Sequence, residues 1–166
     1  MLIERMFDND LAHASWFIAC QQTRVAIVID PSRDIDRYLD FAASRGLQIK
    51  AVAETHIHAD FLSGSAQLAD ATGATCYLSS YGGDDWSYVW PKSSDINTHL
   101  LQDGVEFNVG RIKLKTMHTP GHTPEHICFL VHDVNTSDPI GIVSGDFVFV
   151  GDLGRPDLLE TAAGIE

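Results

Sequence analysis

The stretch ETHIHADFLSG, residues 54–64, places three residue types that bind metals at alternate positions. His56, His58 and Asp60 directly follow the apolar run IKAVAET, residues 49–55, which is typical of a β-strand. Residues i, i+2 and i+4 of an extended chain lie on one side. Both imidazoles would then face one ion, with their Cα atoms about 6.6 Å apart. The next residue, Phe61, has no atom that binds a metal.

Two later segments repeat this design, in which an apolar strand ends in a turn that carries a ligand. MHTPGHTPEH, residues 117–126, turns at Pro120-Gly121 and presents His122. IVSGDF, residues 142–147, turns at Gly145 and presents Asp146. Ligands at the ends of rigid strands make a preorganised site. One His-x-His is a weak signal, but three such segments in this order favour a metal centre.

The remaining pattern predicts a β-rich chain with two helices. Strands or hairpins are expected at 14–20, 24–30, 49–55, 75–79, 105–118, 126–133 and 140–146, helices at 34–46 and 62–73, and a long loop at 80–99. Strands that alternate with helices in this way indicate sheets packed against helices, an α/β arrangement.

Length and composition indicate one globular domain. The chain has 166 residues, of which 45% are hydrophobic and 20% charged. Eleven Lys and Arg against 23 Asp and Glu give a net charge of -12, which repels nucleic acid and anionic membrane surfaces. No nucleic-acid or membrane partner is therefore expected.

The cysteines and the N-terminus favour a cytoplasmic location. Cys20, Cys76 and Cys128 are odd in number and widely spaced, and no CxxC occurs, so a reducing compartment is expected. MLIERMFDND, residues 1–10, has no apolar core of a signal peptide. Apolar runs such as VAIVI, residues 25–29, are too short to span a bilayer.

The motifs THIHAD (55–60), HTPGH (118–122) and SGD (144–146) together resemble those of the metallo-β-lactamase superfamily, over almost the whole chain. The resemblance implies an αββα sandwich, classed as α/β or α+β, with metal at one edge of the sheets. Most members bind two metals through His-x-His-x-Asp-His, a later His, a bridging Asp and a final His.

This chain departs from that pattern twice. Phe61 stands where the fourth residue of the first motif would bind metal, and residue 166 precedes any final His. A second metal would have only Asp60 and Asp146, fewer than the three protein ligands of a catalytic zinc site. The expected centre is mononuclear. Residues 1–166 are expected to be the N-terminal portion of the domain, which is then incomplete at the C-terminus.

Within the superfamily, THIHADFLSG (55–64) followed by SGDFVFVGDLGRPDLL (144–159) resembles the persulfide dioxygenases, especially those fused to rhodanese domains. The resemblance implies one Fe(II) held by His56, His122 and Asp146. Two histidines and one carboxylate on one face are typical of non-haem Fe(II) oxygenases. The implied reaction oxidises a low-molecular-weight thiol persulfide with O2 to sulfite and free thiol, as in sulfide detoxification.

Neighbouring residues have supporting roles in this hypothesis. His58 is expected beside the metal, with metal ligation as the alternative. Asp60 is expected to accept an imidazole N–H and orient a ligand, or else to cap the following helix. Phe61 would form an apolar wall. Arg155 would pair with a nearby carboxylate to stiffen its loop, or contact an anionic substrate.

Other functions stay open on the sequence alone. A zinc-dependent thioester hydrolase of the glyoxalase II type is the main alternative, with Zn²⁺ in place of iron. A β-lactam substrate is a weaker one, and a fragment with a partial site is the non-enzymatic one. The expected partners are a thiol persulfide, O2 and a fused or separate rhodanese domain. If half of one layer is missing, strands near 111–146 lack cover and the chain forms a homo-oligomer, by dimerisation or swapping, or aggregates.

Overall fold

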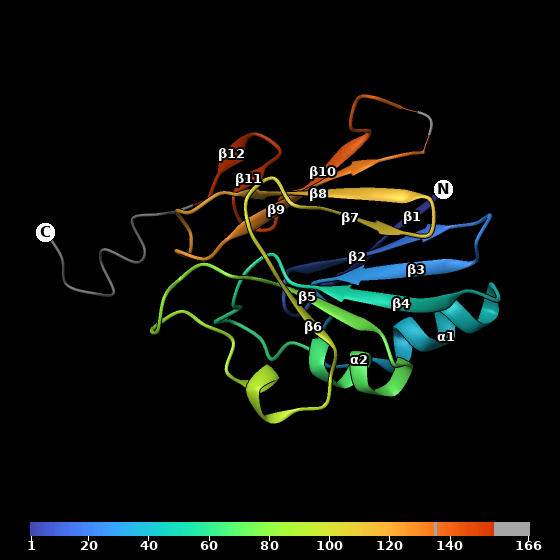
Figure 1. Ribbon diagram of the computed structural model, residues 1–166, viewed down its shortest axis with the longest axis horizontal. Coiled ribbons are helices and arrows are strands. Elements are labelled where there is room, and N and C mark those ends of the chain that lie inside the picture. The colour runs from blue at the N-terminus through green and yellow to red at the C-terminus, as the bar shows by residue number, and fades with distance from the viewer. Residues whose placement is uncertain (135, 155–166) are drawn as a thin grey trace, which may run out of the picture.

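The computed structural model describes residues 1–134 and 136–154, which form two sheets packed face to face (Figure 1). The larger sheet contains β1 (Leu2–Asp8), β2 (His13–Cys20), β3 (Val25–Ile29), β4 (Gln48–Ala53), β5 (Thr75–Ser79) and β6 (Thr98–Leu101), in this order. Strands β1 to β3 are antiparallel, whereas β3 to β6 run parallel. The parallel part brings the carboxyl ends of β3, β4 and β5 to one edge of the molecule.

Helices α1 (Asp36–Ser44) and α2 (Ser65–Thr72) cover the outer face of the larger sheet. Tyr38 and Leu68 are fully buried there against Val28 and Val52. Both predicted helices are confirmed, a few residues shorter than expected. Gly73 ends α2 in the left-handed conformation, with φ 64°.

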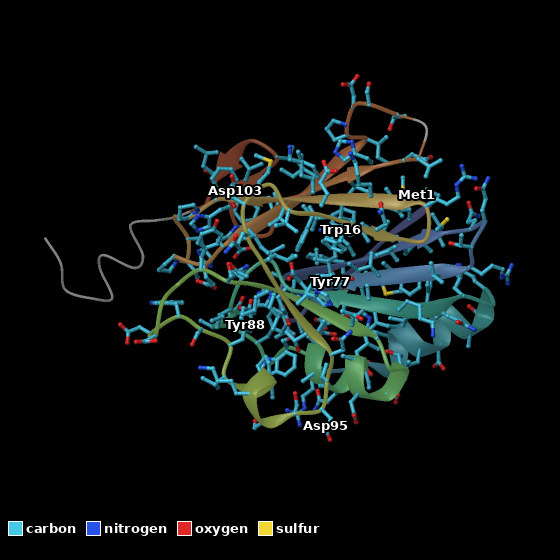
Figure 2. The ribbon with its side chains drawn as sticks, viewed as in Figure 1. Met1, Trp16, Tyr77, Tyr88, Asp95 and Asp103 are labelled. Atoms are coloured by element: carbon cyan, nitrogen blue, oxygen red, sulfur yellow. The ribbon has the colours of Figure 1, made fainter. Side chains whose placement is uncertain are left out.

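The smaller sheet has the order β10-β9-β8-β7 and is antiparallel throughout. Its strands are β7 (Glu106–Val109), β8 (Ile112–His118), β9 (Ile127–His132) and β10 (Gly141–Val143). Alternate residues of β8 and β9 point inward, so that Leu114 and Phe129 are buried against Ile18 and Ile27 of the larger sheet. Figure 2 shows Trp16 and Tyr77 between the two sheets, where both pack against this core.

In the described part, these layers are helices, sheet and sheet. No helix within residues 1–134 and 136–154 covers the outer face of the smaller sheet. Ile142, in its edge strand β10, is 44% exposed, and Ile140, just before that strand, is 47% exposed. A short ribbon of β11 (Val148–Phe149) and β12 (Asp152–Leu153) follows. No helix among the described residues is both long enough and apolar enough to cross a membrane.

Four strands were missing from the sequence prediction, namely β1, β6 and the two short strands of the ribbon, β11 and β12. Strand β1 is an edge strand whose charged and apolar residues are mixed, and β6 lies where the sequence predicts the end of a polar loop. The loop before β6 contains a 3-10 helix, η1 (Trp90–Ser93). Tyr88 and Trp90 pack this loop against the core beneath the helices.

Candidate metal centre

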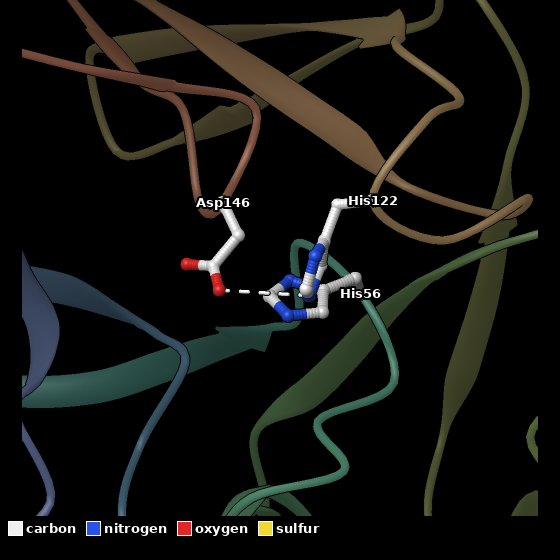
Figure 3. Close-up of side chains that lie close together, drawn as sticks. All are labelled: His56, His122 and Asp146. Atoms are coloured by element: carbon white, nitrogen blue, oxygen red, sulfur yellow. Dashed lines mark ion pairs between the residues drawn. The ribbon is translucent and has the colours of Figure 1, made fainter. Parts of the chain in front are cut away.

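Three side chains meet at one edge of the sandwich, each delivered by the loop after a strand (Figure 3). His56 follows β4, His122 lies between β8 and β9, and Asp146 follows β10. Each offers one ligand atom, and these atoms all lie within 4.8 Å of one another. His122 Nε2 is 3.5 Å from Asp146 Oδ2, and the rings of His56 and His122 are 5.0 Å apart. The structure thus brings together the three residues that the resemblance names.

This donor set fits a divalent transition metal. Two imidazoles and one carboxylate are ligands of intermediate hardness and suit Fe(II) or Zn²⁺. His56 is buried, whereas the side chains of His122 and Asp146 are 25% and 44% exposed, so the cluster opens on one side. Burial holds the pKa of His56 well below its usual value, which keeps its imidazole neutral. Burial also raises the pKa of Asp146, an effect that the nearby His122 opposes.

A hydrogen-bond relay orients His56. Asp30, at the end of β3, accepts a bond from the Thr55 amide at 2.6 Å and another from the Thr55 hydroxyl at 2.8 Å. Thr55 Oγ1 is also 2.9 Å from His56 Nδ1. Because the hydroxyl has only one hydrogen, which goes to Asp30, Nδ1 must carry the proton of this contact. The lone pair of Nε2 is therefore available for a metal.

We expect Thr55→Val to lower metal affinity about 10- to 100-fold, the usual cost of losing an outer hydrogen-bond partner. Valine keeps the shape of threonine but cannot accept the Nδ1 proton. Competition with a chromophoric chelator measures the change. Thr55→Ser keeps the hydroxyl and should retain most of the affinity; equal loss in both variants would point to packing instead.

His58 faces away from this cluster. Its Nε2 lies 3.3 Å from Asp30 Oδ1 and 3.2 Å from Glu54 Oε2, and all three side chains are buried. Burial alone would disfavour a charged imidazole, but the two carboxylates raise the pKa of His58 to about 10. His58, Asp30 and Glu54 lie close enough to hold a cation, and in the metal-free protein the imidazolium itself supplies the positive charge between the two carboxylates. His58 therefore lies beside the metal cluster, not within it.

Phe61 packs against the same histidine. Its ring lies 4.3 Å from that of His58 and 4.0 Å from that of His13, and it lines the cleft beside the metal cluster. An apolar ring thus occupies the side of His58 that faces the cleft. The expected apolar wall is present in the structure.

The two remaining predicted residues differ from expectation or fall outside the described part. Asp60 is exposed and lines the cleft, but within residues 1–134 and 136–154 it makes no hydrogen bond to an imidazole. It does not cap the next helix either, because the N-cap of α2 is Gly64. Arg155 lies outside the described residues.

The sequence analysis missed several residues that support the site. His126 is fully buried behind His56, with ring centroids 5.0 Å apart, and Glu125 accepts a hydrogen bond from the Ile57 amide at 2.6 Å. Asp30 carried one signal, an acidic residue directly after a buried strand, but its sequence context indicates a turn. His118 bonds to the Pro124 carbonyl at 2.9 Å and stacks on Tyr81, a structural role.

Gly145 lets the loop that carries Asp146 approach Thr55 and His126 closely. Its φ is +48°, and a Cβ there would lie 2.5 Å from Thr55 Oγ1 and 2.7 Å from His126 Nε2. Only glycine accepts both the backbone conformation and the close contact. The backbone that carries Asp146 is thereby brought close to Thr55, which orients His56.

A cleft of about 560 Å³ adjoins the cluster. One part of its wall comes from the site, namely His56, His58, Phe61 and Asp146. Another part comes from β1, β2 and β11, and includes Arg5, Phe7, Trp16 and Phe149. A small molecule in this cleft would therefore lie next to His56 and Asp146.

Fold and site together define the class of protein: the chain belongs to the metallo-β-lactamase superfamily, whose family model matches residues 8–164. The predicted fold and superfamily are confirmed. A metallo-β-lactamase from Staphylococcus aureus is 45% identical, with a TM-score of 0.89 over 97% of this chain and 47% of that one.

More specific similarities point to two enzyme activities, that of the persulfide dioxygenase ETHE1 and that of hydroxyacylglutathione hydrolase. ETHE1 from Myxococcus xanthus is 29% identical, with a TM-score of 0.78 over 93% of this chain and 61% of that one. A hydroxyacylglutathione hydrolase from Polaromonas is 33% identical over 93% of this chain and 55% of its own length. The chain spans about half the length of several curated relatives. These similarities support a metal-dependent enzyme, and they are equally compatible with either reaction.

Proposed function

We propose that this chain carries the centre of a mononuclear non-haem Fe(II) persulfide dioxygenase. The observation that carries the proposal is the separation of the two histidines of the first motif. His56 joins His122 and Asp146, while His58 is bound to two buried carboxylates beneath Phe61. Among the described residues, the group at the cleft is that of His56, His122 and Asp146, and we interpret the second group, His58 with Asp30 and Glu54, as a buried ion pair.

The overall reaction is RSS⁻ + O2 + H2O → RSH + SO3²⁻ + H⁺. Fe(II), when bound by His56, His122 and Asp146, supplies affinity for O2 and for sulfur anions. The protein fixes the ligands through Thr55 and Gly145 and leaves one side of the cluster open to the cleft. Phe61 places an apolar surface next to the reacting sulfur, which limits the access of water.

The similarity to hydroxyacylglutathione hydrolases favours a second candidate, zinc-dependent thioester hydrolysis. That reaction usually uses hydroxide held between two metals. Asp60 and Asp146 alone would have to hold the second ion, because Phe61 cannot bind metal and His58 is engaged with Asp30 and Glu54. The geometry therefore supports the dioxygenase better.

Metal content and product analysis test the proposal. We expect the full-length protein, purified without oxygen, to contain about one iron per chain. With glutathione persulfide it should consume O2 and release sulfite in equal amounts. S-lactoylglutathione, a thioester, should not be hydrolysed. Two zinc ions per chain with thioester hydrolysis and no O2 uptake would overturn the proposal.

Two further expectations belong to the same proposal. A rhodanese domain, fused or separate, transfers sulfur between thiols and would form the persulfide that this site consumes. The exposed Ile142 in the edge strand β10, and the exposed Ile140 just before that strand, favour a homo-oligomer. Analytical ultracentrifugation of residues 1–166 tests the second expectation, and a stable monomer at high concentration would contradict it.

A further inference from the structure

We infer that Arg5 forms a binding subsite for an anionic group on the thiol that carries the persulfide; this inference rests on the proposed function. Arg5 lies on edge strand β1, opposite Trp16 of β2 in the strand register. Its side chain and those of Phe7 and Trp16 line the same cleft as His56 and Asp146. One cavity thus joins the metal cluster to a basic residue.

Arg5 carries the basic charge of this cleft, which the carboxylates of Asp30, Asp60 and Asp146 also line. The chain has a net charge of -12, and Arg5 is the one Lys or Arg among the described residues that line the cleft. No carboxylate within residues 1–134 and 136–154 pairs with it at 4.0 Å or less. An arginine without a protein partner can give its parallel N–H groups to a carboxylate or phosphate of a ligand.

Phe7 holds this charge in place. The Arg5 guanidinium lies 4.5 Å from the centre of the Phe7 ring, a cation–π contact. The contact restricts the arginine before a ligand arrives, and Phe7 itself lines the cleft. Less side-chain freedom is then lost on binding.

Apolar side chains form part of the cleft wall. They include Trp16, Ile142 and Phe149, and the last two are 44% and 49% exposed. A ligand that spans the cleft would place its sulfur at the cluster, its uncharged part on these side chains and its anionic end on Arg5. These features fit an extended thiol with a remote carboxylate or phosphate better than inorganic sulfide or a small neutral thiol.

Equilibrium binding of the product thiols tests the inference without turnover. The metal-loaded full-length protein is titrated by calorimetry, without oxygen, with glutathione, coenzyme A and 2-mercaptoethanol. We expect Arg5→Gln to weaken binding of at least one anionic thiol about tenfold, as for loss of a charged hydrogen bond. Binding of neutral 2-mercaptoethanol should not change. A larger loss for glutathione indicates a carboxylate at Arg5, and a larger loss for coenzyme A indicates a phosphate.

Arg45→Gln is the matched control. Arg45 is also exposed and lies over a phenylalanine ring, Phe41, at 3.6 Å, but it is the C-cap of helix α1, outside the cleft. It should bind all three thiols like the wild type, and Arg5→Lys should keep part of the affinity. Unchanged affinity of Arg5→Gln for both anionic thiols would overturn the inference, and so would an equal loss for the neutral thiol.

These results separate the subsite from the proposed reaction. Selective loss of anionic thiols in Arg5→Gln, in a protein that consumes no O2 with persulfide, would support the subsite and refute the dioxygenase. Normal O2 uptake with an unaffected Arg5→Gln would do the reverse. A melting temperature equal to that of the wild type shows that the fold of the variant is intact.

Discussion

Asp146→Asn is expected to lower both iron affinity and persulfide-dependent O2 uptake by more than about a hundredfold. Loss of a group that only orients a ligand typically costs 10- to 100-fold, and Asp146 is assigned as a ligand itself. Asparagine keeps the shape but loses the negative charge that balances the cation. The two imidazoles that remain are fewer than the three protein ligands of typical catalytic sites. Iron content after desalting and oxygen-electrode rates measure the two effects.

The control for this variant is Asp152→Asn, which removes an acidic side chain from the neighbouring ribbon. Asp152 is exposed, and among the residues that the structure describes its carboxylate accepts a hydrogen bond from the adjacent Leu153 amide alone, at 2.8 Å. It should bind iron normally. In the metal-free protein, Asp146→Asn should change the free energy of unfolding by less than about 0.5 kcal/mol, since its side chain is 44% exposed. Iron bound at wild-type affinity in Asp146→Asn would show that another residue completes the site.

The sequence predicted those parts of the site that follow directly from strands. His56, His122 and Asp146 each come within a few residues of a clear apolar run, so their delivery to one edge could be expected. The partners of His58 could not. Asp30 and Glu54 reach it because β3 and β4 are parallel neighbours, and nothing local in the sequence states that pairing. Asp60 had the spacing of a site residue, but the chain is exposed there.

The secondary structure likewise divides into elements that the sequence predicts and elements that it does not. The hairpin of β7 and β8 and both helices carry local signals, namely turn residues at Gly110 and terminating glycines, and were predicted. Strand β6 has no such signal, because Thr98–Leu101 becomes a strand by pairing with β5 across a long intervening loop. Packing of Tyr88 and Trp90 against the core holds that loop, and aromatic residues in a polar segment do not reveal what they contact.

His58→Ala is expected to lower the free energy of unfolding of the metal-free protein by about 3–5 kcal/mol, the usual cost of leaving buried charge without its partner. The change leaves Asp30 and Glu54, 3% and 2% exposed, facing each other without a cation. Urea unfolding at pH 7 measures it. His99→Ala, which removes an exposed histidine, should cost less than about 0.5 kcal/mol.

The pH dependence of folding stability shows whether charged His58 stabilises or destabilises the fold. The folded-state pKa of His58 is raised from 6.5 to about 10 by Asp30 and Glu54, against the effect of burial. A raised pKa in the folded state stabilises the fold fully below pH 6.5, and this stabilisation is lost as the pH rises toward 10. Wild-type stability should therefore fall across that window, and the slope should be shallower in His58→Ala.

A double variant separates charge from packing. His58→Leu with Glu54→Gln replaces the imidazolium by an apolar group and removes one carboxylate, so it should recover part of the stability that His58→Ala loses. These three residues also lie close enough to hold a metal. If His58→Ala unfolds like the wild type without metal but loses stability only when metal is present, the three residues bind an ion. The ion-pair assignment, and with it the reason for a single metal, would then be wrong.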